Sequence, residues 1–274
     1  MPSIQSKDGT SIAVYHWKHE QPKAQVILVH GFGEHAMRYD DFARTLVEAG
    51  YDVHSYDHRG HGHSSATRGY IDHFGQYLDD FDAVLAHCDA SLAGKPRFVV
   101  AHSMGGLVAL MELIDRRPRW QGLVLSSPFL KVKLKVPAWK LLAAQAASKL
   151  YPQLSLPSGL KGNEAARDPE IARVYDTDTL NLKNATARWY IECLAAQDRV
   201  FAEASSIELP LLLLHGEADV IADPQASATL FPRLGSHDKT LGLITGAYHE
   251  IFNEPPAERR AVYARVTDWL TAHM

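Results

Sequence analysis

The chain has 274 residues and the composition of an ordinary globular protein, with 46% hydrophobic and 22% charged residues and a formal net charge of -4. This length allows a sizeable core, and the negative charge with no basic stripe among aromatic residues argues against nucleic acid as a partner. No segment approaches the roughly 20 apolar residues of a membrane span. Met1–Lys7 lacks the apolar region of a secretory signal, so a cytoplasmic location is expected.

Strand and helix patterns alternate along the first half of the chain. Asp8-Gly9 predicts a two-residue hairpin turn between the strands Ser3–Lys7 and Ser11–Trp17. Short apolar runs then predict buried strands, and apolar residues on one face predict helices. In chain order we expect the strand Val26–Val29, the helix Asp40–Ala49, the strand Tyr51–Tyr56, the helix Gln76–Leu92 and the strands Arg97–Ala101 and Gly122–Leu125, with a further helix directly after Ser103.

The alternation is interrupted over Phe129–Ile207, which is rich in alanine and contains no apolar run like Leu211–Leu214. It resumes with the strands Leu211–Leu214 and Lys239–Ile244 and the helices Pro224–Phe231 and Pro256–Ala272. Strands that alternate with helices predict an α/β protein with a mostly parallel sheet covered on both faces. An insertion at the carboxyl edge of such a sheet would lie over the ligand site. We therefore expect a core of residues 1–128 and 208–274 and a cap of residues 129–207.

The run Ala101-His102-Ser103-Met104-Gly105-Gly106 lies where a predicted strand turns into a predicted helix. A serine between small residues in this setting matches the nucleophile elbow, G-x-S-x-G, of α/β-hydrolases, although the first position is Ala101. Small residues allow the strand and the helix to approach closely. Ser103 is therefore the candidate nucleophile.

A serine nucleophile needs a base, and the base needs an orienting acid; in this fold they follow the serine in the order acid, histidine. The histidines after Ser103 are His215, His237, His249 and His273. His249 comes just past the last predicted strand and before the last helix, which is the place expected for the base.

The loop after Leu211–Leu214 supplies the candidate acids. Asp219 lies in the middle of this loop and is the favoured acid, with Glu217 as the next contender. Asp223 precedes Pro224 and has the pattern of a helix N-cap instead. The earlier loop Ser126-Ser127-Pro128 carries no carboxylate and cannot provide an alternative.

Acyl transfer also needs backbone donors for the oxyanion. The N–H of Met104, at the start of the helix after the elbow, is one candidate. The other lies in the loop His30–His35, where glycines flank Phe32 and allow its N–H to turn toward the site. A flexible glycine turn is the plainer interpretation of the same residues.

The segment Val53–Ser64 contains a second cluster, formed by His54, Asp57, His58, His61 and His63, that is dense enough to raise the question of a metal site. The spacing matches no recognised metal motif, and Arg59 would repel a dication. A rigid glycine-rich turn beside the active site is favoured over a metal.

Several motifs together resemble the monoacylglycerol lipase and lysophospholipase-like branch of the serine α/β-hydrolases. They are His30–His35 with Arg38-Tyr39, Tyr56–Ser64, His102–Gly106, His215–Asp219 and Gly246–His249, and the likeness continues through Asp176–Asp178 in the expected cap. The resemblance implies an α/β-hydrolase fold, a triad of Ser103, Asp219 and His249, and oxyanion donors Phe32 and Met104. It also implies a lid that admits an acyl chain, with no cofactor and no metal.

The resemblance also implies a polar pocket for glycerol shaped by residues that match Glu34 and Arg38. The chain departs from the family at two positions. Phe252 stands three residues after His249, where the mammalian lipases carry a second histidine, and Phe32 replaces an alanine. Phe252 is therefore a third candidate substrate-binding residue, and the two departures leave glycerol specificity open.

The start of the expected cap alternates apolar residues with Lys131, Lys133 and Lys135, and Pro137–Leu142 opens a predicted amphipathic helix. One hypothesis is that this edge makes transient contact with an anionic membrane surface. The alternative is a solvated cationic edge whose apolar side packs on the core.

These features predict a serine hydrolase that cleaves carboxylic esters of small amphiphilic molecules, with monoacylglycerols or similar single-chain lipids as the favoured substrates. A lysophospholipase or a general short- or medium-chain carboxylesterase is the main alternative, followed by an amide or thioester hydrolase. A non-catalytic ligand-binding protein is disfavoured because all three triad members occur in the required order.

Overall fold

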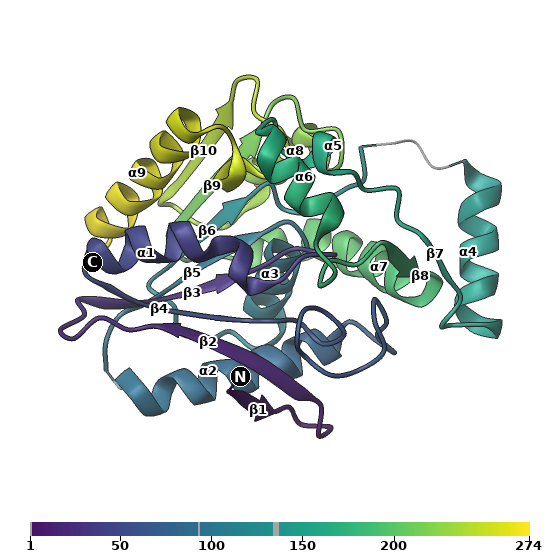
Figure 1. Cartoon of the computed structure of the whole chain (residues 1–274), viewed down its shortest axis with the longest axis horizontal. Coiled ribbons are helices and arrows are strands. Elements are labelled where there is room, and N and C mark those ends of the chain that lie inside the picture. Colours follow the sequence, from purple (N-terminus) through teal and green to yellow (C-terminus); the bar gives the residue numbers. More distant parts are fainter. Residues whose placement is uncertain (1, 93, 134–136) are drawn as a thin grey trace.

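An eight-stranded sheet forms the centre of the computed structural model, which describes residues 2–92, 94–133 and 137–274 (Figure 1). Its strand order is β1-β2-β4-β3-β5-β6-β9-β10. Only β1 and β2 run against their neighbours, and the remaining described pairings are parallel. The predicted α/β class is therefore confirmed. The strands are β1 (Ser3–Gln5), β2 (Ser11–Trp17), β3 (Ala24–Val29), β4 (Tyr51–Tyr56), β5 (Arg97–His102), β6 (Gly122–Ser126), β9 (Leu211–Gly216) and β10 (Lys239–Ile244).

Helices cover both faces of the sheet and enclose two hydrophobic clusters (Figure 1). On one face, α1 (Asp40–Glu48) and α9 (Pro256–Ala272) contribute to the first cluster. On the other face, α2 (Gly75–Leu92), α3 (Met104–Asp115) and α8 (Pro224–Leu230) contribute to the second. Strands buried on both faces explain why the sequence showed continuous apolar runs instead of alternation.

The first hairpin differs from the prediction in its turn. Ser6 donates its N–H to the carbonyl of Thr10 at 2.8 Å, so the loop consists of three residues, 7–9, and not of Asp8-Gly9 alone. Gly9 has a φ of 82°, the left-handed conformation that closes such a loop. The two-residue turn was wrong because the sequence pattern does not show where pairing ends.

Four helices and a small second sheet lie between β6 and β9. They are α4 (Ala138–Leu150), α5 (Gly162–Ala165), α6 (Pro169–Thr177) and α7 (Ala187–Glu203), with β7 (Ser155–Pro157) paired antiparallel to β8 (Asn184–Thr186). The sequence predicted helices here but not this sheet, because β7 is exposed along its whole length and shows no apolar run. Lys135, one of the three predicted edge lysines, lies outside the described residues.

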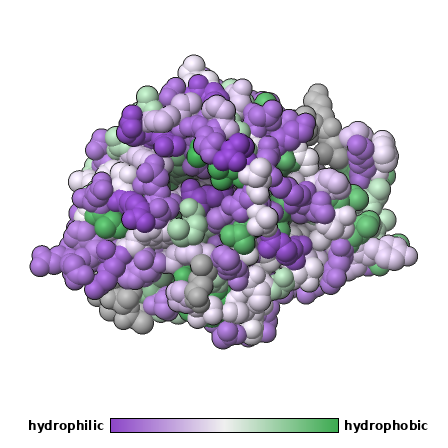
Figure 2. All heavy atoms as spheres, in the orientation of Figure 1, coloured by the Kyte–Doolittle hydropathy of each residue, from purple (hydrophilic) through white to green (hydrophobic). Residues whose placement is uncertain are grey.

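Helix α4 stands at the periphery of the molecule and packs mainly against α7 (Figure 1). Ser148 is the one buried residue described in α4, while Trp139, Leu142 and Leu150 are each at least 66% exposed. Hydrophobic surface appears on the side of the molecule where Figure 1 places α4 (Figure 2). These three large apolar side chains are therefore not packed on the core. No helix in the described part of the chain meets the length and hydropathy needed to cross a membrane.

Short 3-10 helices complete the elements that position the site. They are η1 (Ala36–Tyr39), η2 (Ala204–Ser206), η3 (Phe231–Arg233) and η4 (Ile251–Asn253). The first follows the loop after β3, and the last follows the loop after β10. Because β3, β5, β9 and β10 are parallel, the loops after them meet at one edge of the sheet.

Candidate active site

Ser103 occupies the sharp turn between β5 and α3. Its φ of 50° and ψ of -117° are strained for a residue that is not glycine. The turn is tight because a Cβ on Gly105 would lie 2.4 Å from the carbonyl oxygen of Val29. Ala101, the first position of the elbow, is fully buried. Local packing thus holds the Ser103 hydroxyl at the carboxyl edge of the sheet.

The Ser103 hydroxyl is hydrogen-bonded to a histidine, which in turn bonds an aspartate, and the two come from separate later loops. Its Oγ lies 2.9 Å from Nε2 of His249, and Nδ1 of the same ring lies 2.6 Å from Oδ2 of Asp219. Asp219 is 1% exposed and His249 is 5% exposed. Glu217, the alternative acid, is exposed, and Asp223 caps α8 as predicted by accepting from the N–H of Gln225.

Asp219 is held by four N–H donors. Oδ1 accepts from the backbone N–H groups of Ile221 and Ala222, at 2.7 and 3.0 Å. Oδ2 accepts from His249 and from Nε2 of His215 at 3.0 Å. Burial by itself would raise the pKa of Asp219, but the adjacent His249 and the bonds from both rings hold that pKa well below its ordinary value. The carboxylate therefore stays ionised at neutral pH.

The environment of His249 favours a proton on its ring. Burial lowers the pKa of His249, but Asp219 and, more weakly, Glu250 and Glu34 outweigh burial and raise that pKa above its ordinary value. His102 packs 4.7 Å from the His249 ring, and burial together with His249 lowers the pKa of His102. A base that becomes cationic beside a fixed carboxylate suits proton transfer from a hydroxyl.

The loop after β3 is anchored by Glu34. Its Oε1 accepts from the N–H of Gly31 at 2.5 Å and from the hydroxyl of Tyr39 at 2.7 Å. A Cβ on Gly31 would lie 3.0 Å from Cβ of Ser103, so the loop passes directly over the serine. Phe32 follows at this point, and its ring lies 3.9 Å from the ring of Trp189 on α7.

Arg38 lies between two buried carboxylates. Its Nε is 3.2 Å from Glu34, and its Nη2 bonds Glu250. Its guanidinium also lies over the ring of Tyr175 at 5.0 Å. Burial, and then Glu250, raise the pKa of Glu34. The sequence had singled out Glu34 and Arg38 but missed Glu250, which directly follows His249 and carries no signal of its own.

Phe252 lies away from these groups. It is 2% exposed, and its ring stacks on Phe42 of α1 at 4.6 Å in the core. It is not among the residues that line the cavity over Ser103. The structure therefore does not bring Phe252 together with the other predicted substrate-binding residues, because η4 turns its ring toward the sheet.

A cavity of about 720 Å³ opens over Ser103 and His249. The core contributes Phe32 and Glu34, and the segment between β6 and β9 contributes most of the remaining wall. Aromatic and aliphatic side chains dominate that wall, which is typical of a site for a largely apolar ligand. They include Phe129, Val132, Trp139, Ala143, Ala144, Ala147, Leu154, Leu156, Trp189 and Tyr190, and the loop after β9 adds Ile221.

The histidine-rich turn after β4 forms a hydrogen-bonded support beside the site. His58 bonds the carbonyl of His30 through Nε2, and burial lowers the pKa of His58 to about 3 and of His61 to about 4. Asp57 accepts from the hydroxyl of Tyr15 at 2.7 Å. The candidate metal ligands of this turn, Asp57, His58, His61 and His63, do not form a group of three with ligand atoms close together.

Metal-ligating atoms within 4.8 Å of one another occur, among the described residues, at His16, Asp52 and His54. The His16 and His54 rings are stacked, with centroids 4.1 Å apart, and both bond Oδ2 of Asp52. The Nε2 atoms of both rings already bond Asp52, so hydrogen bonding accounts for this group.

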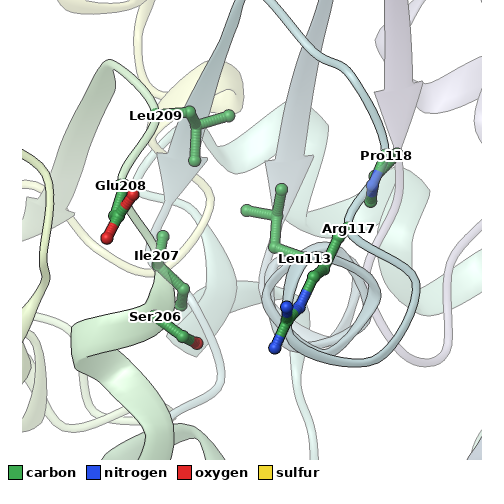
Figure 3. A pocket seen from close by; sticks show the side chains of 7 residues that line it. All are labelled: Leu113, Arg117, Pro118, Ser206, Ile207, Glu208 and Leu209. Carbon is green, nitrogen blue, oxygen red and sulfur yellow. The ribbon is translucent and has the colours of Figure 1, made fainter.

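A second cavity, of about 450 Å³, lies near the end of α3 and the segment before β9 (Figure 3). Its lining residues are Leu113, Arg117, Pro118, Ser206, Ile207, Glu208 and Leu209. Figure 3 shows the guanidinium of Arg117 and the carboxylate of Glu208 on separate sides of this cavity. Because residues 206–209 precede β9, the cavity lies at the opposite edge of the sheet from Ser103, and none of its lining residues is a histidine.

Known proteins and one family model match this chain in sequence over most of its length. The family model described as serine aminopeptidase, S33 (Hydrolase_4) matches residues 20–256. Human monoglyceride lipase is 31% identical, with 99% of this chain and 90% of the human protein covered. The phospholipase YtpA of Bacillus subtilis is 33% identical, over 88% of this chain and 93% of that protein.

Solved structures agree in fold. The crystal structure of the Paleococcus ferrophilus monoacylglycerol lipase has a TM-score of 0.86 and 32% identity, covering 95% of this chain and 99% of that one. A soluble variant of the Saccharomyces cerevisiae monoglyceride lipase, solved with a substrate analog, has a TM-score of 0.87 at 23% identity, covering 100% of this chain and 95% of that one. At this lower identity the second likeness concerns the fold alone.

Proposed function

We propose that this chain, which belongs to the serine aminopeptidase S33 (Hydrolase_4) family and is a carboxylic ester hydrolase, acts on monoacylglycerols through Ser103, His249 and Asp219. The observation that carries the proposal is the hydrogen-bonded chain from Ser103 Oγ through His249 to Asp219 at the floor of an apolar cavity. A nucleophile, its base and the acid that orients the base are thereby aligned where an acyl chain fits.

In the acylation step, Ser103 Oγ attacks the ester carbonyl while Nε2 of His249 takes the hydroxyl proton. Asp219 holds the imidazole orientation and stabilises the cation that forms. The negative charge on the carbonyl oxygen is received by the backbone N–H groups of Phe32 and Met104. His249 then returns the proton to the leaving alcohol, and the acyl group remains on Ser103.

In the second step, a water molecule replaces the alcohol. His249 takes a proton from this water, the hydroxide attacks the acyl-enzyme, and the bond to Ser103 Oγ breaks as His249 returns the proton to the serine. The products are a fatty acid and the regenerated enzyme. Glu34 supports both steps because it fixes the loop that carries Phe32 through the N–H of Gly31.

The charges of the cavity favour a neutral head group. The described lining residues include the carboxylates of Glu34, Glu164 and Glu250 but only one side chain that is always cationic, Lys140. Arg38 is already paired with two of these carboxylates. The described lining would offer a phosphate one cation not bonded to these carboxylates, Lys140, whereas the hydroxyls of glycerol would find acceptors.

We also propose that α4 touches the lipid surface from which the substrate comes. Its exposed Leu142 and Leu150 lie on the same helix as Trp139 and Lys140, which line the cavity. Exposed apolar side chains interspersed with lysines are suited to the boundary between head groups and acyl chains. Lys133, from the predicted cationic edge, instead lies 3.4 Å from Asp223.

The proposed nucleophile is tested by covalent labelling with a fluorophosphonate probe. The wild-type chain is expected to label at one site, and Ser103→Ala is expected to lose labelling with an unchanged circular dichroism spectrum. Ser127→Ala, which alters a buried serine in the neighbouring loop, serves as the matched control. Persistent labelling of Ser103→Ala would overturn the assignment.

The substrate class is tested with a panel at equal acyl-chain length: a monoacylglycerol, a lysophosphatidylcholine, an aryl ester and an aminoacyl amide. The monoacylglycerol is expected to give the highest kcat/KM. A preference for the lysophospholipid or for the amide would contradict the substrate proposal while leaving the triad intact.

The lipid contact is tested by co-sedimentation with anionic vesicles. The double variant Leu142→Ser, Leu150→Ser is expected to bind about tenfold more weakly, because two exposed apolar side chains that would enter the lipid surface are lost. Leu243→Ser removes an exposed leucine on β10 and serves as the control. Equal binding of all three proteins would remove the idea.

A further inference from the structure

We infer that His215 and Ser227 form a second arm on the proposed catalytic acid and act as positioning residues for it. The inference rests on the proposed triad. It starts from the hydrogen bonds of Oδ2 of Asp219, which accepts from two imidazoles, His249 on one side and His215 on the other.

The bonds around Asp219 form a continuous chain of five side chains. Ser103 Oγ lies 2.9 Å from His249, and His249 lies 2.6 Å from Asp219. Beyond the carboxylate, Nε2 of His215 lies 3.0 Å from the same oxygen, and Nδ1 of His215 lies 2.7 Å from Oγ of Ser227. The order serine, histidine, aspartate, histidine, serine is therefore symmetric about Asp219.

The two arms differ in what they can reach. Ser103 and His249 line the cavity, whereas His215 and Ser227 are both fully buried and do not line it. His215 is the last residue but one of β9, and Ser227 lies on α8, so rigid elements hold both. This second arm cannot contact the substrate, and its influence must pass through Asp219.

The contacts of His215 assign its proton to Nε2. An ionised carboxylate can only accept, so Nε2 donates to Asp219, and Nδ1 is left to accept from the Ser227 hydroxyl. Asp219 then has two donors on each oxygen, since Ile221 and Ala222 supply the other pair. This complete set fixes the rotation of the carboxylate and spreads its charge.

The consequence concerns the proton affinity of His249. A carboxylate that is shared with His215 attracts the His249 imidazolium less than one that His249 holds alone. Removal of the His215 donor should therefore raise the pKa of His249 further and loosen the orientation of Oδ2. In the wild-type chain, His215 therefore limits the rise in the pKa of His249, and a larger fraction of His249 is neutral and able to accept a proton at neutral pH.

Several other titratable groups face His249, and a change at His215 or Ser227 must leave their contacts intact. They are Glu250, which follows it in the chain, Glu34 from the loop after β3, with Arg38 bonded to both, and His102 at the end of β5. None of them is bonded to His215 or Ser227. A change at either of these two residues therefore reaches His249 through Asp219.

The experiment measures kcat and KM against pH, on a water-soluble ester, for His215→Leu, His215→Gln and Ser227→Ala. His215→Leu removes the donor and is expected to lower kcat about tenfold with little change in KM. It should also move the acidic limb of kcat/KM to higher pH by about half a unit. His215→Gln places an amide N–H near the position of Nε2 and should retain the wild-type profile.

Ser227→Ala keeps the ring but removes the hydroxyl that donates to Nδ1 and supports the His215–Asp219 bond. We expect a shift in the same direction as for His215→Leu and a smaller one, and this variant remains informative if His215→Leu fails to fold. Nitrogen-15 spectra of the wild-type chain should show His215 protonated at Nε2. His54→Gln, at a buried histidine bonded to Asp52, is the control and should leave the profile unchanged.

Wild-type pH profiles for both His215→Leu and Ser227→Ala, or a proton on Nδ1 of His215, would overturn the inference. A shift that His215→Gln does not rescue would also overturn it, because the effect would then come from packing and not from the donor. Failure of the triad itself is separate: it would appear as activity that survives Ser103→Ala or Asp219→Asn.

Discussion

Helix α3 begins directly after Ser103 at the floor of the cavity, and helix α4 lines the cavity wall, yet the two helices are held in opposite ways. Every residue from Met104 to Ile114 in α3 is buried, whereas Ser148 is the one buried residue described in α4. The first helix carries the turn that positions Ser103, and the second carries large apolar side chains into solvent. The proposed nucleophile thus follows from close packing, and the proposed lipid contact lies on a weakly packed element.

This difference has a physical reason. The proposed proton transfer from Ser103 to His249, with Asp219 orienting the ring, needs distances held within a few tenths of an ångström, which only a close-packed interior provides. An entrance for an acyl chain must instead expose apolar surface and allow side chains to move. One helix cannot be both closely packed and exposed, so close packing is found at α3 and exposed apolar surface at α4.

The largest expected effect comes from breaking the rigid side at Asp219. Asp219→Asn keeps the shape but removes the charge that orients and stabilises His249, so kcat should fall by about 10⁴-fold. The measurement is steady-state hydrolysis of an aryl ester. Glu217→Gln, at the exposed carboxylate of the same loop, is the matched control and should retain activity. Comparable losses in both variants would contradict the assignment of the acid.

A smaller effect is expected from a single methyl group at the elbow. Gly105→Ala would place a Cβ 2.4 Å from the backbone oxygen of Val29, which cannot move aside. The free energy of unfolding should fall by about 2 to 3 kcal/mol. Ala146→Gly in the exposed part of α4 should cost about 1 kcal/mol or less by the same denaturant titration. A larger loss at Ala146 would reverse the comparison between the two helices.

The pH dependence sharpens the picture of the rigid side. His249 must be neutral to accept a proton, and its pKa is raised above the ordinary value of 6.5. The kcat/KM should therefore be lost as the pH falls through a value above 6.5, about tenfold per pH unit below it. An acidic limb centred below 6.5 would show that Asp219, Glu250 and Glu34 do not dominate the environment of His249.

The smallest effect is expected on global stability when α4 is altered. Leu142→Ser together with Leu150→Ser removes apolar groups that are already exposed, so the free energy of unfolding should change by less than about 0.5 kcal/mol. Amide hydrogen exchange should be faster in α4 than in α3 in the wild-type chain. Equal protection of the two helices would show that α4 is as firmly held as the core.

Much of the fold could be predicted because its signals are local. Four consecutive leucines, Leu211–Leu214, are enough to predict a buried strand. The helix Pro256–Ala272 has the predicted bounds, and its start is marked by a proline. The hairpin turn at Asp8-Gly9 was wrong by one residue, since pairing of Ser6 with Thr10 depends on the register of both strands. The strand β7 was missed because exposed strands carry little apolar pattern.

The sequence by itself determined the α/β alternation, the elbow at Ser103 and the order in which Asp219 and His249 follow it. Only the tertiary structure decided that Phe252 faces the core, that Glu250 pairs with Arg38, and that His215 shares Asp219 with His249. The physical reason is range. Elbows, caps and apolar runs depend on residues a few positions apart, whereas these contacts join side chains from separate loops, whose directions are set only when the sheet and its helices pack together.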